Sequence, residues 1–377
     1  MAQKGKLREV ASVFFKLGLI AFGGPAAHIS MMEEEIVNKR KWMDRQHFLD
    51  LMGITNLIPG PNSTEMTMHC GHERAGVPGL FVAGFTFIFP AIVITGVLAW
   101  LYSLYGTLPN VAPWIIGIKP AVLAIIASAV FKLGKKALKG WELGVLGVLV
   151  LAASLLGVNE IIALLTAGVV GAFYFSIRNK LFDSPKSIIP LFLLQLPTTT
   201  IASITSLNVF WTFLKVGSVL YGSGYVLFAY LDAELVTTGW LTRQELMDAI
   251  AVGQFTPGPV LSTATFVGYQ LTDSIWGALA ATLGIFLPSF LFVLILNPLI
   301  PKMRKSKVLR FFLDSVNIAA VAVMTGILIE MTKTSLLDWQ GVTIAVISFS
   351  LIFGVKKISS MWIVLGGSLL GYLLSLV

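Results

Sequence analysis

The chain has 377 residues, of which 56% are apolar and only 12% charged, and its formal net charge is +8 at neutral pH. The charged share is about half that of an average soluble protein. Several charge-free runs exceed the roughly 18 residues that mark a membrane-spanning helix, most clearly 77–104 and 274–301. These features exclude a soluble globular protein and indicate a polytopic membrane protein.

The composition also argues against several kinds of ligand. Cys70 is the single cysteine, so no internal disulfide forms, and no Cys/His cluster has the spacing of a zinc site. The basic residues lie in short loops between apolar runs, where they set membrane topology. We therefore expect no cofactor, no metal and no nucleic-acid partner.

One sequence pattern occurs twice, displaced by 198 or 199 residues. The matched residues are Lys16 with Lys215, Gly23 with Gly222, Trp42 with Trp240, Arg45 with Arg243, Asp50 with Asp248, Pro59-Gly60-Pro61 with Pro257-Gly258-Pro259, and Pro90 with Pro288. So many glycine, proline and charged residues in register indicate an internal repeat. The predicted units are a first repeat at 1–186, a linker transmembrane helix at 187–206 and a second repeat at 207–377.

Equivalent loops of the two copies carry unequal charge. Segment 37–45 has four basic residues and its partner 235–243 has one, whereas 104–112 has none and its partner 302–310 has five. Because short cytoplasmic loops collect Lys and Arg, equivalent loops are expected on opposite sides of the membrane. The repeats are therefore predicted to have inverted topology.

A threading of nine crossings satisfies these sides. The predicted spans are 77–104, 113–131, 141–156, 160–177, 188–206, 275–300, 311–329, 338–355 and 358–377. This threading places the N-terminus in the cytoplasm and the C-terminus outside.

Four further apolar segments begin and end on one side in this threading. They are 8–37, 46–73, 207–234 and 244–272. Each is interrupted midway by glycine or proline, and each arm has about a dozen residues, too few to cross ~30 Å of hydrocarbon. The predicted fold class is an all-α polytopic membrane protein with two inverted-topology repeats and re-entrant (broken) helical hairpins. In the alternative, 10–30 crosses fully, which would leave the basic stretch 39–45 outside.

Interrupted helices in inverted repeats are typical of a transporter site near the membrane midplane. A helix is expected to begin after each Pro-Gly-Pro, and its first N–H groups together with its positive dipole end favour an anion. The polar residues at these two starts are Asn62, Ser63, Thr64, Ser262 and Thr263. Helix capping is the alternative role for them.

Charged residues inside apolar segments are functional candidates. Lys16 and Lys215 occupy equivalent places, and two converging ammonium groups would favour a dianion; snorkelling to the interface is the alternative. Asp50 and Asp248 are matched, and we interpret them as ion-pair partners that hold a hairpin to the scaffold. Glu65 is unmatched, since Thr263 takes its place, and is the candidate carrier of a coupling proton.

Several of these sequence patterns resemble those of a known family. The runs from Phe15 to Ile29, from Trp42 to Pro61 and from Gly71 to Gly76, with the weaker second copy ending at Pro259, resemble the chromate ion transporter family in its long-chain, two-domain form. The resemblance implies a plasma-membrane carrier that exports chromate, with sulfate as its analogue, by alternating access and with the proton motive force. It also implies that family residues of the first copy form the site, namely Gly23, Gly24, Pro25, His28, Pro59, Gly60 and Pro61. In the second copy, Gly222 matches Gly23.

Two other classes of function remain open. A cation/proton antiporter could use Asp50, Asp248 and Glu65, and an intramembrane enzyme could use Glu65, His69 and Glu73. A second copy without the last three residues favours a carrier over an enzyme. The expected partners are therefore a small oxyanion, chromate or sulfate, and membrane lipid, with a homodimer as a possible assembly.

Overall fold

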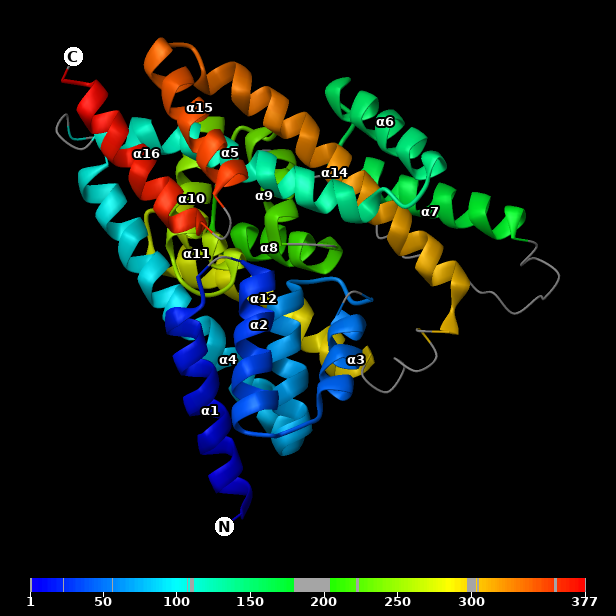
Figure 1. The fold of residues 1–377 in the computed structure, drawn as a ribbon. Helices are drawn as coiled ribbons and strands as arrows, with labels where there is room; N and C mark the ends of the chain where they lie inside the picture. Colours follow the sequence, from blue (N-terminus) through cyan, green and yellow to red (C-terminus); the bar gives the residue numbers. More distant parts are fainter. Residues whose placement is uncertain are drawn as a thin grey trace.

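The protein is helical throughout the parts of the computed structural model that are described, namely residues 2–22, 24–55, 57–106, 108, 112–179, 204–221, 224–296, 303, 305–355 and 358–376. The first repeat contains α1 (Ala2–Ile20), α2 (Pro25–Met32), the π-helical turn η1 (Glu33–Lys39), α3 (Arg45–Thr55), α4 (Asn62–Tyr105), α5 (Ala112–Ala137), α6 (Trp141–Leu155) and α7 (Glu160–Arg178) (Figure 1). The second contains α8 (Ser206–Val219), η3 (Gly224–Val226), α9 (Leu227–Leu231), η4 (Asp232–Val236), α10 (Arg243–Phe255), η5 (Val260–Ser262), α11 (Thr263–Thr272), α12 (Ile275–Leu296), α14 (Lys307–Ser335), α15 (Trp339–Gly354) and α16 (Ser360–Leu374).

The all-helical membrane fold predicted from the sequence is confirmed. Five helices are long and apolar enough to cross a membrane: α4, α5, α7, α12 and α14. The helices α6, α15 and α16 fall at predicted spans but have only 15 or 16 residues, so each reaches about 22–24 Å at 1.5 Å per residue. Most of the predicted linker span 188–206 lies outside the described residues.

The helix α4 is two arms that fold back on each other. Ala75 and Gly76 have non-helical backbone angles, and Gly76 has a φ of 67°. A β-carbon on Gly71 would touch the carbonyl of Gly79, although eight residues of straight helix would separate them by roughly 12 Å. The same close approach recurs between Gly268 of α11 and Gly277 of α12. The bend at 75–76 and the turn between α11 and α12 are therefore equivalent in the two repeats.

The first helix of each repeat crosses a long helix of the same repeat at a glycine. Gly18 of α1 lies against the carbonyl of Phe87 on α4, and Gly217 of α8 lies against the carbonyl of Ile285 on α12. A methyl group in place of either hydrogen would meet backbone atoms, which cannot move aside as a side chain does. Both repeats thus use glycine at the same place to bring two helix backbones together.

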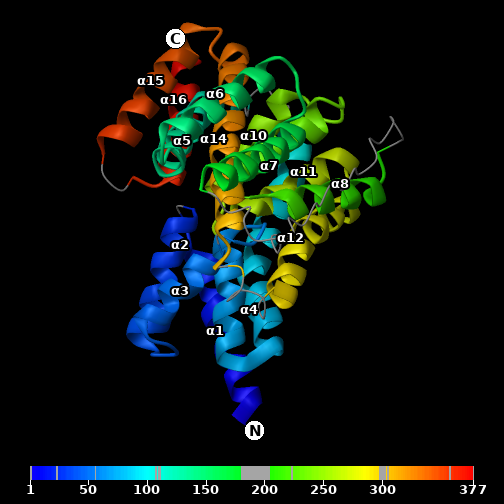
Figure 2. The same cartoon turned by 90° about the vertical axis from the view of Figure 1, so that its right-hand side faces the viewer.

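The second half of each repeat packs on the other repeat. The helices α15 and α16 pack on α5, and α6 and α7 pack on α14 (Figures 1 and 2). Gly117 of α5 meets the backbone of Gly367 and Gly371 of α16, and Gly168 of α7 meets Phe312 of α14. The repeats are therefore interlocked.

The two ends of the chain lie far apart. The N-terminus lies at the end of the molecule formed by α1 and the bend of α4, and the C-terminus lies at the opposite end, beside α15 and α16 (Figures 1 and 2). The predicted sides of the termini, the domain boundaries and the re-entrant depth of the hairpins remain predictions.

Two neighbouring glycines on α16 provide a test of the packing of α16 on α5. A β-carbon on Gly367 would meet Ala121 and the Gly117 carbonyl, whereas Gly366 has open space. We expect Gly367→Leu to lower the free energy of unfolding by about 1–3 kcal/mol and Gly366→Leu to leave it nearly unchanged. Thermal unfolding of both variants in one detergent measures the difference; equal transitions would contradict the helix packing described here.

Candidate functional site

Two backbone hydrogen bonds join the repeats at their broken helices. The N–H of Gly60 donates to the carbonyl of Leu220 over 2.7 Å, and the N–H of Gly258 donates to the carbonyl of Ala21 over 2.9 Å. Gly60 and Gly258 are equivalent positions, as are Ala21 and Leu220. Each Pro-Gly-Pro turn therefore docks on the helix break of the opposite repeat, and the four predicted interruptions meet in one place.

The turn glycines have conformations and surroundings that other residues cannot share. Gly60 has a φ of 142° and Gly258 a φ of 90°, a region that disfavours residues with a β-carbon. A β-carbon on Gly60 would meet the side chains of Glu65 and Ser289; one on Gly258 would meet Ala91 at 2.8 Å. Because Ala91 and Ser289 are equivalent, the two turns face matching positions that differ in polarity.

The helix start after the first turn has no side-chain cap. The helix α4 begins at Asn62, as predicted, with Pro61 preceding it in an extended conformation. The amides of Thr64 and Glu65 donate to the Pro61 carbonyl. The buried hydroxyl of Thr64 makes no hydrogen bond with a described group. The capping alternative is therefore not what the structure shows for Thr64.

The second turn is followed by a different start. A short 3₁₀ turn, η5, precedes α11, and neither begins with a side-chain cap. The Thr263 hydroxyl donates to the Val260 carbonyl over 2.7 Å, and Ser262 accepts a weak hydrogen bond from Thr95 at 3.4 Å. The polar groups of the second copy are thus occupied within the protein.

The break between α1 and α2 adds a histidine to this centre. Gly24 has a φ of 81°, Pro25 is the first residue of α2, and no side chain caps that helix. The Nε2 of His28 lies 3.1 Å from the carbonyl of Ala21, the same oxygen that Gly258 binds. The remaining ring nitrogen, Nδ1, has no partner among the described groups. Gly23 and Gly222 lie outside the described residues.

Glu65 is the charged residue closest to the first turn. Its side chain is fully buried, and neither carboxyl oxygen has a hydrogen-bond partner among the described groups. The hydroxyl of Ser289, on α12 of the second repeat, is also buried and unpartnered. Both groups border the position that a Gly60 β-carbon would take. The first turn therefore has unsatisfied polar side chains from both repeats.

Lys16 and Lys215 each bind an acid of their own repeat. Lys215 lies 2.6 Å from Glu234, and its side chain is 23% exposed; Lys16 lies 3.9 Å from Glu35 and is 60% exposed. Glu35 and Glu234 are equivalent positions in the two π-helical turns. Whether either lysine contacts substrate stays a prediction; in this conformation each fastens its first helix to the turn that follows the break.

The arginine pair has a parallel arrangement. Arg45 lies 2.8 Å from Glu33, and Arg243 makes two hydrogen bonds of 3.1 and 3.2 Å with Asp232. Burial lowers the pKa of Arg243, but the bond and charge of Asp232 outweigh it and hold that pKa above its usual value. Four of the five acids of the π-helical turns, Glu33, Glu35, Asp232 and Glu234, thus bind the four matched cations.

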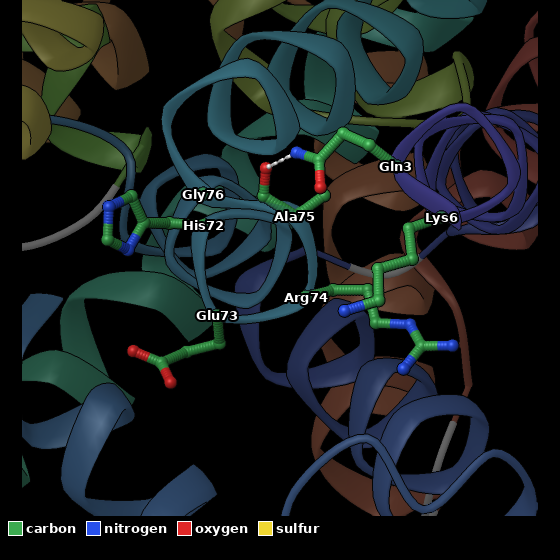
Figure 3. Close-up of a pocket in the computed structure, with 7 residues that line it drawn as sticks. All are labelled: Gln3, Lys6, His72, Glu73, Arg74, Ala75 and Gly76. Carbon is green, nitrogen blue, oxygen red and sulfur yellow. Dashed lines mark hydrogen bonds between the residues drawn. The ribbon is translucent and has the colours of Figure 1, made fainter. Parts of the chain in front are cut away.

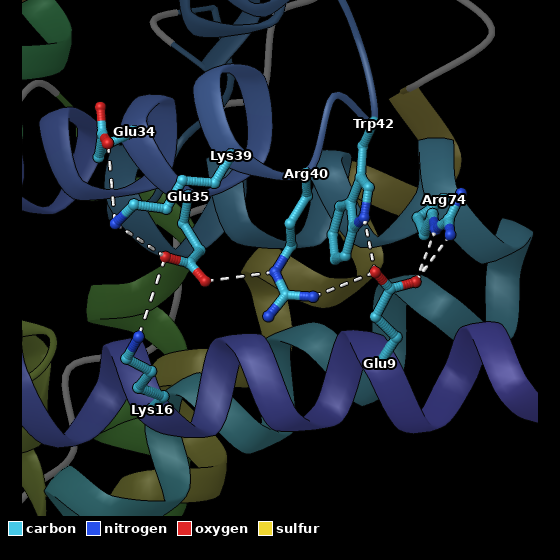
Figure 4. A network of polar contacts seen from close by, with 8 residues as sticks. All are labelled: Glu9, Lys16, Glu34, Glu35, Lys39, Arg40, Trp42 and Arg74. Atoms are coloured by element: carbon cyan, nitrogen blue, oxygen red, sulfur yellow. Dashed lines mark hydrogen bonds and ion pairs between the residues drawn. The ribbon is translucent and has the colours of Figure 1, made fainter.

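In the first repeat these ion pairs extend into a network (Figure 4). Glu35 also binds Arg40, and Glu9 binds Arg40, Arg74 and the indole of Trp42. Burial raises the pKa of Glu35, but the Arg40 bond and the neighbouring lysine charges outweigh it and lower that pKa. The network therefore stabilises the fold at neutral pH and loses strength as the pH falls through that carboxyl's folded pKa.

The matched aspartates differ in their partners. Asp248 on α10 accepts a 2.7 Å bond from Tyr102 and lies 3.6 Å from Lys119, which confirms the predicted ion pair for this member. Asp50 on α3 accepts a 3.4 Å bond from Gln46 of its own helix. Accordingly α10 packs on α5 and α16 as well as α4, whereas α3 packs on α4 and η1 and has a partly exposed face.

A polar pocket of about 480 Å³ opens at the bend of α4 (Figure 3). It is lined by Gln3, Lys6, His72, Glu73, Arg74, Ala75 and Gly76. Glu73 lies roughly 17 Å along the helix from Asn62, so this pocket is separate from the broken-helix centre. Lys6 and Arg74 are the two cations among its lining residues (Figure 3).

Sequence reasoning missed several residues of the centre. The acids Glu33, Glu35, Asp232 and Glu234 were detectable, because they match between the copies at the same displacement as the lysines. Ser289 and Tyr221 gave no comparable signal, since each replaces an apolar residue, Ala91 or Phe22, of the first copy. Only the packing of the two repeats brings them to the first turn.

The unequal ion pairs give a stability prediction. Lys215→Ala leaves the largely buried Glu234 without its partner, so we expect a loss of about 2 kcal/mol in the free energy of unfolding. Lys16→Ala removes a longer, exposed contact and should cost less than about 1 kcal/mol. Thermal unfolding at low and high salt compares them. A larger effect of Lys16→Ala would show that exposure does not govern these pairs.

Comparison with known proteins gives a consistent assignment. A model of the chromate transporter family matches residues 8–172 and 207–372. The chromate transport protein of Cupriavidus metallidurans is 30% identical over 373 residues, covering 97% of this chain and 92% of that protein. The probable chromate transport protein of Synechococcus elongatus is 29% identical over 346 residues, covering 88% and 86%. An uncharacterized transporter of Bacillus subtilis is 28% identical over 181 residues, covering 46% of this chain and 90% of that protein.

No solved structure matches. Since the family model matches both repeats over most of their length, the chain belongs to the chromate transporter family.

Proposed function

We propose that this protein is a secondary transporter that exports chromate, or the related oxyanion sulfate, across the plasma membrane by alternating access coupled to the proton motive force. The binding site is the centre at which the four helix breaks meet. Lys16, Lys215 and the broken-helix residues named from the sequence are the proposed site residues. Its similarity to chromate transport proteins supports the substrate class.

The observation that carries this proposal is the reciprocal docking of the Pro-Gly-Pro turns. It places the uncapped start of α4 beside the break of the opposite repeat. A helix start offers N–H groups and partial positive charge without a mobile side chain. Such a site binds an anion in transit without the trapping that several full charges would cause.

Unequal burial of the repeats supports alternating access. The helix α10 is anchored to Lys119 of α5 and Tyr102 of α4, whereas the equivalent α3 retains a partly exposed face. In inverted repeats, exchange of two such packing arrangements opens the site to the opposite side. The structure is then one of two states, with the α10 side closed.

The alternative functions fit the geometry less well. A cation/proton antiporter that used the matched aspartates would need both of them free, but Asp248 is engaged by Lys119 and Tyr102. An intramembrane enzyme using Glu65 and Glu73 would need them together, but Glu73 binds His47 and is 41% exposed while Glu65 is fully buried.

Uptake of labelled chromate and labelled sulfate into proteoliposomes, with imposed pH and voltage gradients, tests the proposal. Accumulation of either anion that collapses with the gradients supports it. Flux of monovalent cations with no oxyanion flux would instead establish the antiporter.

Substitution of the turn glycines should remove the site. A valine at Gly60 would collide with Glu65 and Ser289, and one at Gly258 with Ala91, both at positive φ. We expect Gly60→Val and Gly258→Val to reduce chromate binding in detergent at least tenfold, the first more severely because its copy is richer in polar groups. Gly53→Val, on the open face of α3, is the control. Unchanged binding in both turn variants would place the site elsewhere.

The inverted repeats predict opposite sides for the termini. Reporters fused to each end should show the N-terminus in the cytoplasm and the C-terminus outside, because the basic loops of the repeats are reversed. The opposite positions of the termini in Figures 1 and 2 agree with this expectation. Two reporters active on the same side would contradict the nine-crossing topology.

A further inference from the structure

Beside the first Pro-Gly-Pro turn, at the start of α4, lies an acid that takes part in none of the ion pairs described above. Glu65 lies in the first turn of α4, is fully buried, and has no hydrogen-bond partner for either carboxyl oxygen among the described groups. Ser289 approaches the same spot from α12 with its own unpartnered hydroxyl. Two buried, unsatisfied groups from opposite repeats, facing a helix start, are unusual in a folded protein and indicate a site for something that binds there.

The surroundings of Glu65 contain no free cation among the described side chains. Lys16 of α1 is bound to Glu35, and Asp248 of α10 to Lys119 and Tyr102. On α3, Asp50 interacts with Gln46 and His47 with Glu73. Further titratable groups on the packed elements include His28, held to Ala21; Tyr221, within range of the Glu65 charge; Tyr225; Tyr269 of α11; and His69, one turn along α4. The helix α12 carries no titratable residue.

A carboxylate in this position would be an uncompensated buried charge, which is unfavourable. It would also compete with an incoming anion for the same helix start. A protonated carboxyl is neutral and presents an O–H donor. Together with the Ser289 hydroxyl it would offer two donors to an oxyanion held at the start of α4.

We propose, on the basis of the oxyanion transport proposed above, that Glu65 is the proton-binding group of this site and that its proton and the oxyanion bind together. Ionised Glu65 repels the anion; protonated Glu65 and Ser289 donate hydrogen bonds to it. The proton therefore travels in the same direction as the anion. The proton remains on the carboxyl while the anion is bound and leaves to water after the anion is released.

The equivalent position of the second repeat has no such proton-binding acid. Thr263 occupies the place of Glu65, and its hydroxyl donates to the Val260 carbonyl. Ala91 occupies the place of Ser289. One proton with one dianion leaves a net charge of −1 on the moving complex, so the electrical component of the proton motive force, negative inside, drives export. A pH gradient that is acidic outside opposes the accompanying proton.

Sulfate is the suitable probe, because it stays a dianion from pH 5 to 9 whereas chromate takes up a proton in this range. Binding of labelled sulfate to the purified full-length protein should weaken at least tenfold as the pH rises over this range. At the alkaline end of this range, where Glu65 of the free protein is ionised and sulfate binds weakly, sulfate addition to a weakly buffered solution should cause uptake of about one proton per bound anion. This second measurement needs no variant.

The Glu65→Gln variant should bind sulfate with an affinity that does not depend on pH, and without proton uptake. Ser289→Ala should weaken binding while proton uptake persists. Glu73→Gln, on the same helix but exposed, should keep the wild-type profile. Sulfate binding by the wild type without proton uptake, or proton uptake that persists in Glu65→Gln, would overturn this inference alone. If neither sulfate nor chromate binds to the wild type at any pH, the proposed function fails, and this inference with it.

Discussion

Everything at the centre of this protein depends on two peptide N–H groups that are satisfied by the opposite repeat. A buried amide without a partner costs free energy comparable to a lost hydrogen bond, and the two turns have no strand or helix to supply one. Gly60 obtains its partner from Leu220 and Gly258 from Ala21. Since each acceptor exists only because a helix ends there, the breaks in one repeat are required by the turns in the other.

The charged groups are arranged equivalently in the two repeats but are buried to different extents. Both π-helical turns present acids to a lysine and an arginine of their own repeat, but the second-repeat pairs are more enclosed. Separating the two partners of a buried ion pair leaves uncompensated buried charges, which is strongly unfavourable. The ion pairs of Lys215 and Arg243 are therefore the more enclosed of the two sets.

Much of the fold could be predicted from the sequence. Long apolar runs identify membrane helices by length alone, and Gly-Pro interruptions mark breaks because proline lacks an N–H donor. The matched Lys and Arg residues and Asp248 identified positions that do make ion pairs, and the unmatched Glu65 proved to be buried at the first turn. The partners of these residues could not be predicted, because Lys119 and Ser289 come from helices far away in the sequence that are brought near only when the repeats interlock. The lysines pair with Glu35 and Glu234 of their own repeats rather than with each other, and these matched acids were detectable in the sequence.

The interlocked packing also bears on biosynthesis. The helices α6 and α7 of the first repeat pack on α14, which is made much later, while α5 receives α15 and α16 at the very end of the chain. Chains enter the membrane from the N-terminus onward. When the first repeat has been inserted, the glycine faces of α5 and α7 can contact only lipid, and they become buried in protein only after the second repeat has emerged. Loss of α16 would therefore expose Gly117 in the half of the protein that was made first.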